Sequence, residues 1–547
     1  MRWPMSPAQR LIADTIRERR RGAIIWILGG AAVMVVMALA LESELARFEG
    51  GREALAASVQ AGAEAMRLLR WPAERLDTLG GYITYHNVTL FAYFLSVYAL
   101  VQGCRAIRGA ETTQVLEPVL ATGRPRTAVL LERAIGFGIV LLTIAVGLGA
   151  GLTLAMAMGG EPNAVGSFLT AVACGICAFV AYALGVAVSQ LIGTARSAAG
   201  VVALAVTVLY LLTNIWDRIG ALGVIRFVSP FYYFGQSRAL VPGHGFSISA
   251  AVTSLAMSVA LLGLAAWAFE RRDVGAPLWV RRPGPLALPT RVQRPALRRL
   301  WSAILLRERT GLLVWVISAG FGMGLMAWLE PNVIDVWSKF GFTKNLSAID
   351  PRFSPTDQYL SFAAEILAPI LAALVVTRAA AWIADLDQGR VEIILSTPLS
   401  WARLVAQRLI ALLVEAALVI VGAVAGLVIV AVAVGANVRI VGVLRLAATT
   451  YLLAVALGAL AALLVAWLRT NVAVTAMSIL FGASYVFLLL VLLFGWPDWL
   501  AKLSLFGAIG HPYLRAPPVE GLVFLAVLAI VSAAAAAAVA QRSPKVR

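Results

Sequence analysis

Charged side chains are scarce in this chain. Asp, Glu, Lys and Arg make up 13% of the 547 residues, against about 25% in soluble domains. Hydrophobic residues make up 61%, and the mean hydropathy is +0.87. This balance excludes an ordinary soluble domain and indicates an integral membrane protein.

Lysine is nearly absent, so the net charge of +17 comes from arginine. The arginines gather at the ends of apolar runs, which is the pattern of loops that stay on the cytoplasmic side of a membrane. A pI of about 10.5 is also typical of nucleic-acid-binding domains. The placement of the arginines argues against that class, and we expect no nucleic-acid partner.

Signatures of catalysis are missing as well. A P-loop needs a Gly-Lys pair, and the chain has none, so it cannot form a standard ATP site by itself. The three cysteines lie in or beside apolar runs, and we expect Cys174 and Cys177 to be small packing residues. His86, His244 and His511 are far apart and expected near the outer surface. We predict a subunit that is not an enzyme and holds no metal or cofactor.

Long apolar runs are what the chain has in abundance, and a bilayer core needs about 20 apolar residues per helix. We predict an all-α integral membrane fold with twelve transmembrane helices in two halves of six, and with both termini in the cytoplasm. The run 22–41 has a counterpart in the second half, so we expect a retained membrane helix there and not a cleaved signal. The expected spans lie near 22–41, 86–104, 134–158, 165–192, 198–215 and 248–268, then near 311–329, 359–383, 404–434, 446–468, 472–494 and 520–540.

Polar stretches divide the chain further. Arginine-rich residues 1–21 have helical apolar spacing, which predicts an amphipathic helix on the cytoplasmic surface. The aromatic segments Asn214–Ser247 and Trp496–Pro518 are expected to be interfacial or re-entrant. The remaining expected divisions are a first transmembrane half over 1–269 with an outer loop at 42–83, a basic, proline-rich cytoplasmic linker at 270–295, and a second half over 296–547 with its own surface helix at 296–309.

One polar stretch occurs twice at matching places. Glu111–Arg133 reads ETTQVLEPVLATGRPRTAVLLER, and Leu386–Arg408, 275 positions further on, reads LDQGRVEIILSTPLSWARLVAQR. We call residues 111–126 the first polar segment and residues 386–401 the second.

Each polar segment predicts a short helix with one apolar face beside a glutamate, because three apolar residues stand at i, i+3 and i+4. A helix of this kind suits docking into a groove of another protein. The alternative is that the apolar face packs on the protein's own helices and the glutamate is solvated. The repetition at matched places favours docking. The residues are Leu116, Val119 and Leu120 with Glu117, and Val391, Ile394 and Leu395 with Glu392.

The second polar segment carries the pattern G-x-x-E-x-[LI]-L-[AS]-T-P-x-[ST], formed by Gly389, Glu392, Ile394, Leu395, Ser396, Thr397, Pro398 and Ser400. This pattern after the second helix of a six-helix unit resembles the ABC-2-type transporter permeases. In the first polar segment Gln114 replaces the glycine and Gly123 replaces the proline. The resemblance covers nearly the whole chain. The fused twelve-helix form is similar to permeases of polyketide-antibiotic and multidrug exporters of actinobacteria, and it implies two repeats of the type V exporter kind.

The resemblance implies that the protein lies in the cell membrane. It also implies that both polar segments are coupling helices on the cytoplasmic side. Two copies of a separately encoded ABC ATPase would bind ATP and Mg²⁺ and push on them. The residues implied at these contacts are Glu111, Leu116, Glu117, Val119, Leu120 and Thr122, and Gly389, Val391, Glu392, Ile394, Leu395, Thr397 and Pro398.

In this family the second and fifth helices of each half face the substrate path. The candidates on them here are Phe91, Tyr93, Phe94, Tyr98, Tyr210 and Asn214, and Phe362, Glu365, Tyr485 and Phe487. Aromatic residues with a few polar groups suit bulky amphipathic substrates, although ordinary helix packing explains them equally well. Glu365 is the sharpest candidate, because an acid inside a membrane helix should face a cavity or a partner. Glu415 is expected to be structural.

The function that this resemblance implies is ATP-driven export of drugs or other bulky amphipathic compounds, with membrane lipid as the surrounding partner. Export of a lipid, glycan or peptide stays open as an alternative. An ion-gradient-driven secondary transporter should carry charged relay residues in several helices, and this chain has few. A non-transporting membrane assembly or sensor subunit would have no obvious use for two repeated polar segments.

Overall fold

The computed structural model describes residues 6–47, 51–63, 66–67, 69–217, 220–278, 299–340, 352–494 and 496–542. Within these ranges all regular structure is helical, with no strand. Twelve of the helices are long and apolar enough to cross a membrane. The predictions of an all-α fold and of twelve spans are therefore confirmed. Most of the predicted linker 270–295 lies outside the described residues, as do parts of the outer loop 42–83 and the first residues of the surface helix 296–309.

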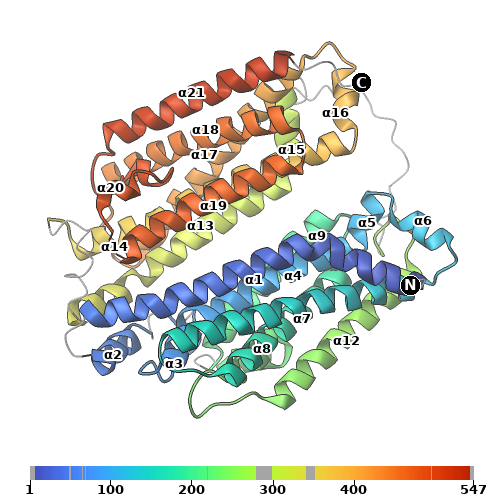
Figure 1. Cartoon of the computed structure of the whole chain (residues 1–547). Helices are drawn as coiled ribbons and strands as arrows, with labels where there is room; N and C mark the ends of the chain where they lie inside the picture. Colours follow the sequence, from blue (N-terminus) through green and yellow to red (C-terminus); the bar gives the residue numbers. More distant parts are fainter. Residues whose placement is uncertain are drawn as a thin grey trace. The chain divides into compact units, whose positions relative to one another are not determined.

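The chain forms two compact units, Met1–Leu286 and Ala287–Arg547. In each unit the long helices run side by side (Figure 1). The long helices of unit 1 are α1 (Pro7–Arg47), α4 (Thr89–Ala106), α7 (Arg126–Met158), α8 (Ala164–Leu191), α9 (Ala195–Ile215) and α12 (Ile248–Arg271). Those of unit 2 are α13 (Leu300–Phe340), α14 (Pro355–Glu365) with α15 (Leu367–Asp387), α17 (Trp401–Ala433), α18 (Ile440–Leu468), α19 (Asn471–Phe494) and α21 (Val519–Arg542).

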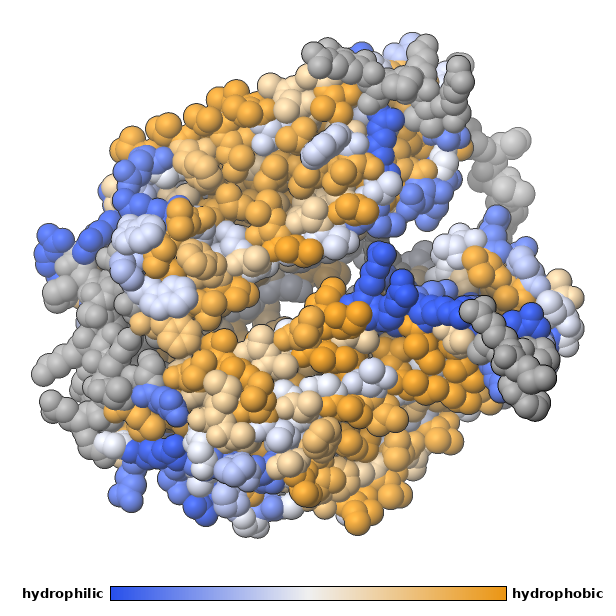
Figure 2. Space-filling view, in the orientation of Figure 1, coloured by the Kyte–Doolittle hydropathy of each residue, from blue (hydrophilic) through white to orange (hydrophobic). Residues whose placement is uncertain are grey.

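The two units repeat the same set of helix neighbours. In unit 1, α7 packs on α1, and α8 packs on α4, α7, α9 and α12. In unit 2, α17 packs on α13, and α18 packs on α15, α17, α19 and α21. Hydrophobic residues cover the visible sides of the helices in both units, whereas hydrophilic residues gather at helix ends (Figure 2). This distribution is the one that a lipid-facing helical protein needs.

The opening helix of each unit is longer than expected. The sequence predicts a surface helix at 1–21 and a separate span at 22–41, but α1 runs from Pro7 through the end of that span as one helix of 41 residues. In unit 2, α13 likewise joins the expected surface helix to the next span and continues to Phe340. At 1.5 Å per residue α1 is about 62 Å long, roughly twice the thickness of a bilayer core. Gly22, where the break was expected, lies against Tyr98 inside the continuous helix.

Glycines bring the first and third long helices of each unit into close contact. On α7, Gly147 faces Ile27 and Gly151 faces Ala31 of α1. On α17, Gly422 faces Val316 and Gly426 faces Gly320 of α13. In each unit a Cβ at either glycine would collide with the opening helix. Pairs of small residues four apart are typical of closely packed membrane helices. Gly422 and Gly426 lie 275 positions after Gly147 and Gly151, which is the same offset that relates the two polar segments. The internal repeat therefore also includes these helix contacts, which the sequence alone does not predict.

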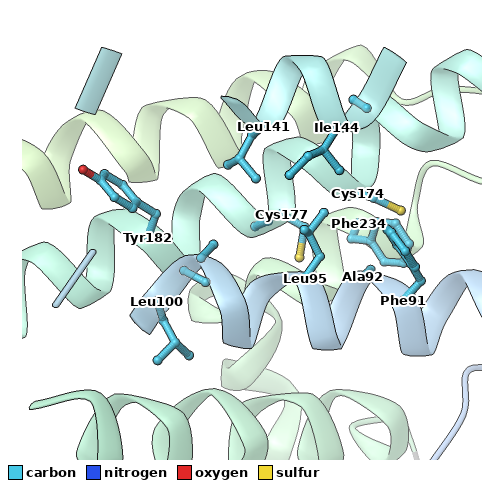
Figure 3. Packing of buried hydrophobic residues seen from close by; sticks show 14 of the residues in the cluster. Phe91, Ala92, Leu95, Leu100, Leu141, Ile144, Cys174, Cys177, Tyr182 and Phe234 are labelled. Carbon is cyan, nitrogen blue, oxygen red and sulfur yellow. The ribbon is translucent and has the colours of Figure 1, made fainter. Parts of the chain in front are cut away.

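The core of unit 1 is built on α4, α7 and α8 (Figure 3). Cys174 and Cys177 of α8 are buried free thiols among apolar side chains of α4 and α7. The Cys177 thiol also lies 3.7 Å from the Ser96 hydroxyl. Both cysteines thus serve as small packing residues.

The second span is irregular in both units, for different reasons. In unit 1, α3 (Leu79–Ile83), a π-helical turn η1 (Thr84–Val88) and α4 form one continuous span. In unit 2 the span breaks between α14 and α15 at Ile366. Pro369 lacks the N–H that would bond the carbonyl of Glu365, so the helix loosens at this acid.

Short helices occupy the segments between the long ones. Unit 1 has α2 (Gly51–Ala63), and its late segment holds η2 (Gly220–Val224), α10 (Ile225–Val228) and α11 (Pro230–Gly235). The late segment of unit 2 holds α20 (Asp498–Ala501) and η5 (Gly507–Ile509). These pieces fit the expectation that the aromatic segments are broken and not continuous spans.

Candidate functional site

Both polar segments fold as short helices between two long ones (Figure 1). The first contains the end of α5 (Arg108–Thr112) and α6 (Leu116–Ala121), between α4 and α7. The second contains α16 (Arg390–Leu395), between α15 and α17.

The apolar face of each short helix points into its own unit. Leu116 is fully buried, and Val119 and Leu120 pack against the unit 1 core. Val391 is buried in the same way, whereas Ile394 and Leu395 are half-buried. The expectation that Leu116 and Val391 contact a partner is therefore corrected to packing within their own unit, while for the half-buried residues, which are Val119, Leu120, Ile394 and Leu395, the docking role stays a prediction. Leu116 and Val391 hold each helix on the protein because burying them removes apolar surface from water.

The outward face of each helix is made of other residues of the same pattern. Glu117 and Glu392 are exposed, as are Thr122 and Thr397. Around them Pro118 and Ala121 are exposed in the first polar segment, and Ser396, Pro398 and Ile393 in the second. Ile393 stands out because 73% of its surface is exposed. A partner would therefore meet a glutamate flanked by small, apolar and hydroxyl side chains.

The same left-handed turn precedes both helices. Gly389 has φ +67°, and Gln114, which stands in its place, has φ +57°. Glycine adopts this conformation at little cost, but other L-residues are strained in it by about 1–2 kcal/mol. The first polar segment thus keeps the left-handed turn although it has Gln114 in place of a glycine. Its backbone is therefore strained at this position, whereas that of the second polar segment is not.

The two threonines of the pattern end their helices in the same way. The Thr122 hydroxyl donates to the carbonyl of Val119 at 2.7 Å, and the Thr397 hydroxyl donates to the carbonyl of Ile394 at 2.6 Å. These bonds satisfy backbone carbonyls near the C-terminal end of each helix, where no further backbone N–H of the same helix is available to donate.

Glu111 is not on the outward face. Its carboxylate accepts a hydrogen bond from Arg108 at 2.9 Å and another from Arg272, which follows α12. All three side chains are almost fully buried. Burial lowers the pKa of the Arg272 guanidinium, and the hydrogen bond to Glu111 opposes that shift. The expected ATPase contact at Glu111 is thus corrected to an internal anchor of the first polar segment.

The arginines of this anchor bind other parts of unit 1 as well. Arg108 donates to the carbonyls of Ser189 at 2.9 Å and Ala276 at 2.8 Å. Arg272 donates to the Gln190 side-chain oxygen at 2.8 Å. The first polar segment is therefore tied to the end of α8 and to the chain after α12.

The second polar segment is anchored by Asp385 at the end of α15. Its carboxylate accepts from Arg390 of α16 and Arg307 of α13, each at 3.3 Å, and from Arg408 of α17 at 3.1 Å. About a fifth of the Asp385 side chain is exposed, and Arg307 and Arg390 are half-exposed. This anchor is more open to solvent than the one at Glu111.

Most path candidates of unit 1 belong to its packed interior. The Tyr93 hydroxyl forms a hydrogen bond with the Thr207 hydroxyl at 2.8 Å. The centroids of the Tyr93 and Tyr210 rings are 4.7 Å apart. The Tyr210 hydroxyl donates to the carbonyl of Leu69 at 2.6 Å. These contacts, together with the burial of Asn214, support the packing interpretation for these three residues.

The other unit 1 candidates divide into two groups. Phe91 and Tyr98 both pack on the Trp26 ring of α1, with ring centroids 5.4 Å and 5.6 Å away. Phe94 is different, because 55% of its surface is exposed. It is the unit 1 candidate best placed to meet a substrate or lipid.

In unit 2 the candidates are less enclosed. Phe362 is 52% exposed, and Tyr485 and Phe487 are half-buried beside Phe506 and Trp496. Glu365 lies at the break between α14 and α15, where its Oε1 is 2.6 Å from Nδ1 of His511. The expectation that this acid needs a cavity or a partner is met by His511.

Several residues of these sites are not identified by sequence reasoning. They are Arg108, Arg272 and Gln190 in unit 1, and Asp385 in unit 2. A charge at the edge of an apolar run is the signal that could have found the three ionisable ones. Among the described residues, no group of three or more His, Cys, Asp or Glu side chains could hold a metal ion.

Comparison with protein families agrees with this geometry. Residues 11–274 match the model described as ABC-2 family transporter protein. Residues 284–541 match the model described as multidrug efflux system permease Rv1217c, C-terminal domain. The chain belongs to the ABC-2 family of transporter permeases. Comparison with curated proteins found no match. It is thus a multi-pass membrane protein of a family whose members work with ABC ATPase subunits.

Proposed function

We propose that this permease is the membrane subunit of an ATP-driven exporter of drugs or other bulky amphipathic compounds. ATP and Mg²⁺ would be bound and ATP hydrolysed by two copies of a separate ABC ATPase subunit. The observation that carries the proposal is the pair of short helices at equivalent places in two units, each with its pattern glutamate exposed. The likeness of the second half to a multidrug efflux permease supports the substrate class.

The coupling function is assigned to the outward faces of the two polar segments. Glu117 and Glu392, with Thr122, Thr397 and Pro398, would rest in a groove on each ATPase. The inward residues Leu116, Val119 and Leu120, and Val391, Ile394 and Leu395, fix the helix to the helices that must move. A force on the outward face is then passed to the long helices through Glu111 in unit 1 and Asp385 in unit 2. ATP binding would bias a two-state equilibrium in this way.

The topology follows from this assignment. Two six-helix repeats of the type V exporter kind would place both polar segments and both termini in the cytoplasm, in the cell membrane. The arginine-rich beginnings of α1 and α13 would lie at the cytoplasmic surface, where anionic lipids attract basic residues. The linker 270–295 would join the halves on the same side.

Substrate would pass exposed aromatic and ionisable groups of the second and fifth spans. Phe94, Phe362 and the Glu365–His511 pair are the candidates that the structure leaves open to contact. Of the remaining candidates, those of unit 1 belong to its packed interior, and Tyr485 and Phe487 of unit 2 are half-buried.

The proposal is tested on the ATPase that copurifies with the tagged permease from its native cells. Glu117→Ala combined with Glu392→Ala should lower the association by roughly tenfold, because two charged contacts of about 0.7 kcal/mol each are lost. The matched control changes Glu53 and Glu520 to alanine, two exposed acids outside the polar segments. Full association and full vanadate-sensitive transport by the double variant would overturn the coupling assignment, and transport driven by a proton gradient without any ATPase would overturn the proposed function.

A further inference from the structure

A carboxylate and an imidazole meet at the break in the second span of unit 2. Glu365 ends α14, and its Oε1 lies 2.6 Å from Nδ1 of His511 in the late segment. Both side chains are accessible, since 28% of the Glu365 side chain and 40% of the His511 side chain is exposed. A proton from solvent or a substrate molecule can therefore reach this pair.

Aromatic rings lie beside the same carboxylate. Phe362 is one turn before Glu365 on the same side of α14, and 52% of its surface is exposed. Tyr485 of α19 lies within electrostatic reach of Glu365, and the centroids of the Tyr485 and Phe506 rings are 5.5 Å apart. A carboxylate attracts an organic cation by charge, and an aromatic face attracts it by cation–π contact. The surroundings of Glu365 therefore fit a cation that carries an apolar body.

The proton on His511 decides the charge of this pair. Histidine side chains commonly gain a proton as the pH falls from about 8 to about 5. With a neutral imidazole, the pair carries the single negative charge of Glu365. With an imidazolium, the pair is electrically neutral, and its positive member already lies against one carboxylate oxygen. A proton on His511 and an organic cation therefore compete for the same carboxylate.

Other ionisable groups come from the elements around the pair. Carboxylates, guanidinium groups and phenols ordinarily keep one charge state between about pH 5 and pH 8, whereas an imidazole does not. We therefore assign the pH response of this site to His511. The described groups are Glu330 of α13, Asp357 of α14, Tyr485 of α19, Arg439 at the start of α18, and Tyr513 and Arg515 of the late segment.

Unit 1 has a pair of the same kind, but an arginine fixes its charge. Nε2 of His244, in the late segment of unit 1, lies 2.9 Å from Oε2 of Glu74. Nη1 of Arg238 lies 2.5 Å from the same oxygen. Because a guanidinium is always charged, the Glu74 carboxylate is neutralised with or without a proton on His244. Among the described residues no arginine pairs with Glu365, so its charge is controlled by His511.

We propose that His511 is a specificity-determining residue that admits organic cations to Glu365 when it is neutral and excludes them when it carries a proton. The inference rests on the proposed export function, in which this pair lies on the substrate path, and it names the class of substrate concerned. In the proposed topology the late segment lies on the outer side of the membrane. The pH outside the cell would then set the preference of the exporter for cations.

The inference is tested by binding of two probes to the purified full chain in nanodiscs of zwitterionic lipid. One probe is naphthylmethyl-trimethylammonium, whose charge does not change with pH, and the other is its neutral carbon isostere neopentylnaphthalene. Equilibrium dialysis measures both, with binding to empty nanodiscs subtracted. The cation should bind about tenfold more tightly at about pH 8 than at about pH 5.5, because the pair has its negative charge only at the higher pH. The neutral probe should bind equally at both.

Two variants separate the proton of His511 from a proton on the carboxylate itself. His511→Asn keeps a nitrogen donor near the position of Nδ1 but cannot gain a charge, so the cation should bind tightly at both pH values. His511→Arg places a permanent charge against Glu365, as Arg238 does in unit 1, and cation binding should be weak at both. Unchanged binding of the neutral probe checks that each variant is folded. The matched control, His244→Gln in unit 1, should keep the pH dependence of the wild type.

Three results would overturn the inference. The first is no saturable binding of the cation to the wild-type chain at either pH. The second is the wild-type pH dependence in His511→Asn, which would assign the effect to the carboxylate. The third is an equal pH dependence of the neutral probe. The measurement needs no ATPase and no transport, so its failure would leave the export proposal to its own copurification test.

Discussion

The two units of this permease fix their short outward helices by different side-chain contacts. Both hold a short outward helix on a set of membrane spans, and both use the same left-handed turn to start it. Unit 1 holds its helix with a fully buried Arg108–Glu111–Arg272 cluster and fills its interior with aromatic rings. Unit 2 holds its helix with the more exposed Asp385 cluster, in which Arg307 and Arg390 are half-exposed, and has a cavity below it that is lined by three arginines and three acids. The repeat preserves backbone geometry and helix neighbours, while the electrostatics and the packing of the two halves have diverged.

The largest expected effect tests the two anchors against each other. Glu111→Ala leaves Arg108 and Arg272 buried without their carboxylate, and we expect a loss of about 3–5 kcal/mol in the free energy of unfolding. Asp385→Ala should cost clearly less, about 1–2 kcal/mol, because Arg307 and Arg390 can turn to solvent. Thermal unfolding of both variants in detergent, followed by circular dichroism, measures the difference. Equal losses would remove the distinction between a buried and an open anchor.

Exchanging the turn residues between the segments should change stability in opposite directions. Gly389→Gln forces a side chain into the left-handed region and should cost about 1–2 kcal/mol. Gln114→Gly relieves that strain in the first segment and should stabilise unit 1 by about 0.5–1 kcal/mol after the added flexibility of glycine is subtracted. The same unfolding measurement applies. Destabilisation by Gln114→Gly would mean that the Gln114 side chain makes contacts worth more than the strain.

The smallest expected effect concerns the candidate path in unit 2. Glu365→Gln removes the charge beside His511 but keeps a hydrogen-bonding group of the same size. Export of cationic compounds relative to neutral ones should fall about two- to fivefold, the range expected for a half-exposed charge pair. Drug-resistance profiles of cells with equal amounts of either protein measure this ratio. The control is Phe94→Leu in unit 1, which should lower export of both classes alike, and an unchanged ratio in Glu365→Gln would remove the acid from the path.

The sequence predicts the long helices of this protein well, because runs of about 20 apolar residues have few alternatives. It also locates both polar segments, since Glu117 and Glu392 repeat at a fixed distance. What it cannot predict is the direction of a helix face. Leu116 and Val391 read equally well as a docking face and as a packing face, and only the surrounding helices decide that they are buried.

Long-range partners are the second limit. Arg272 lies 161 positions from Glu111, and no local pattern links the two. The strain at Gln114 is hidden for a similar reason, since glutamine is not a residue that favours a left-handed turn. The join between the expected surface helix and the first span is missed because the change from polar to apolar composition at Gly22 is also compatible with one long helix.

The most direct measurement of the central claim is crosslinking from the two outward faces to the ATPase. The native cysteines Cys104, Cys174 and Cys177 are buried, so Glu117→Cys and Glu392→Cys each introduce an accessible thiol for a short thiol-to-amine crosslinker. We predict a permease–ATPase product from both positions in the copurified complex and none from Glu53→Cys. Absence of the product at both positions, in a complex that still contains the ATPase, would contradict the account.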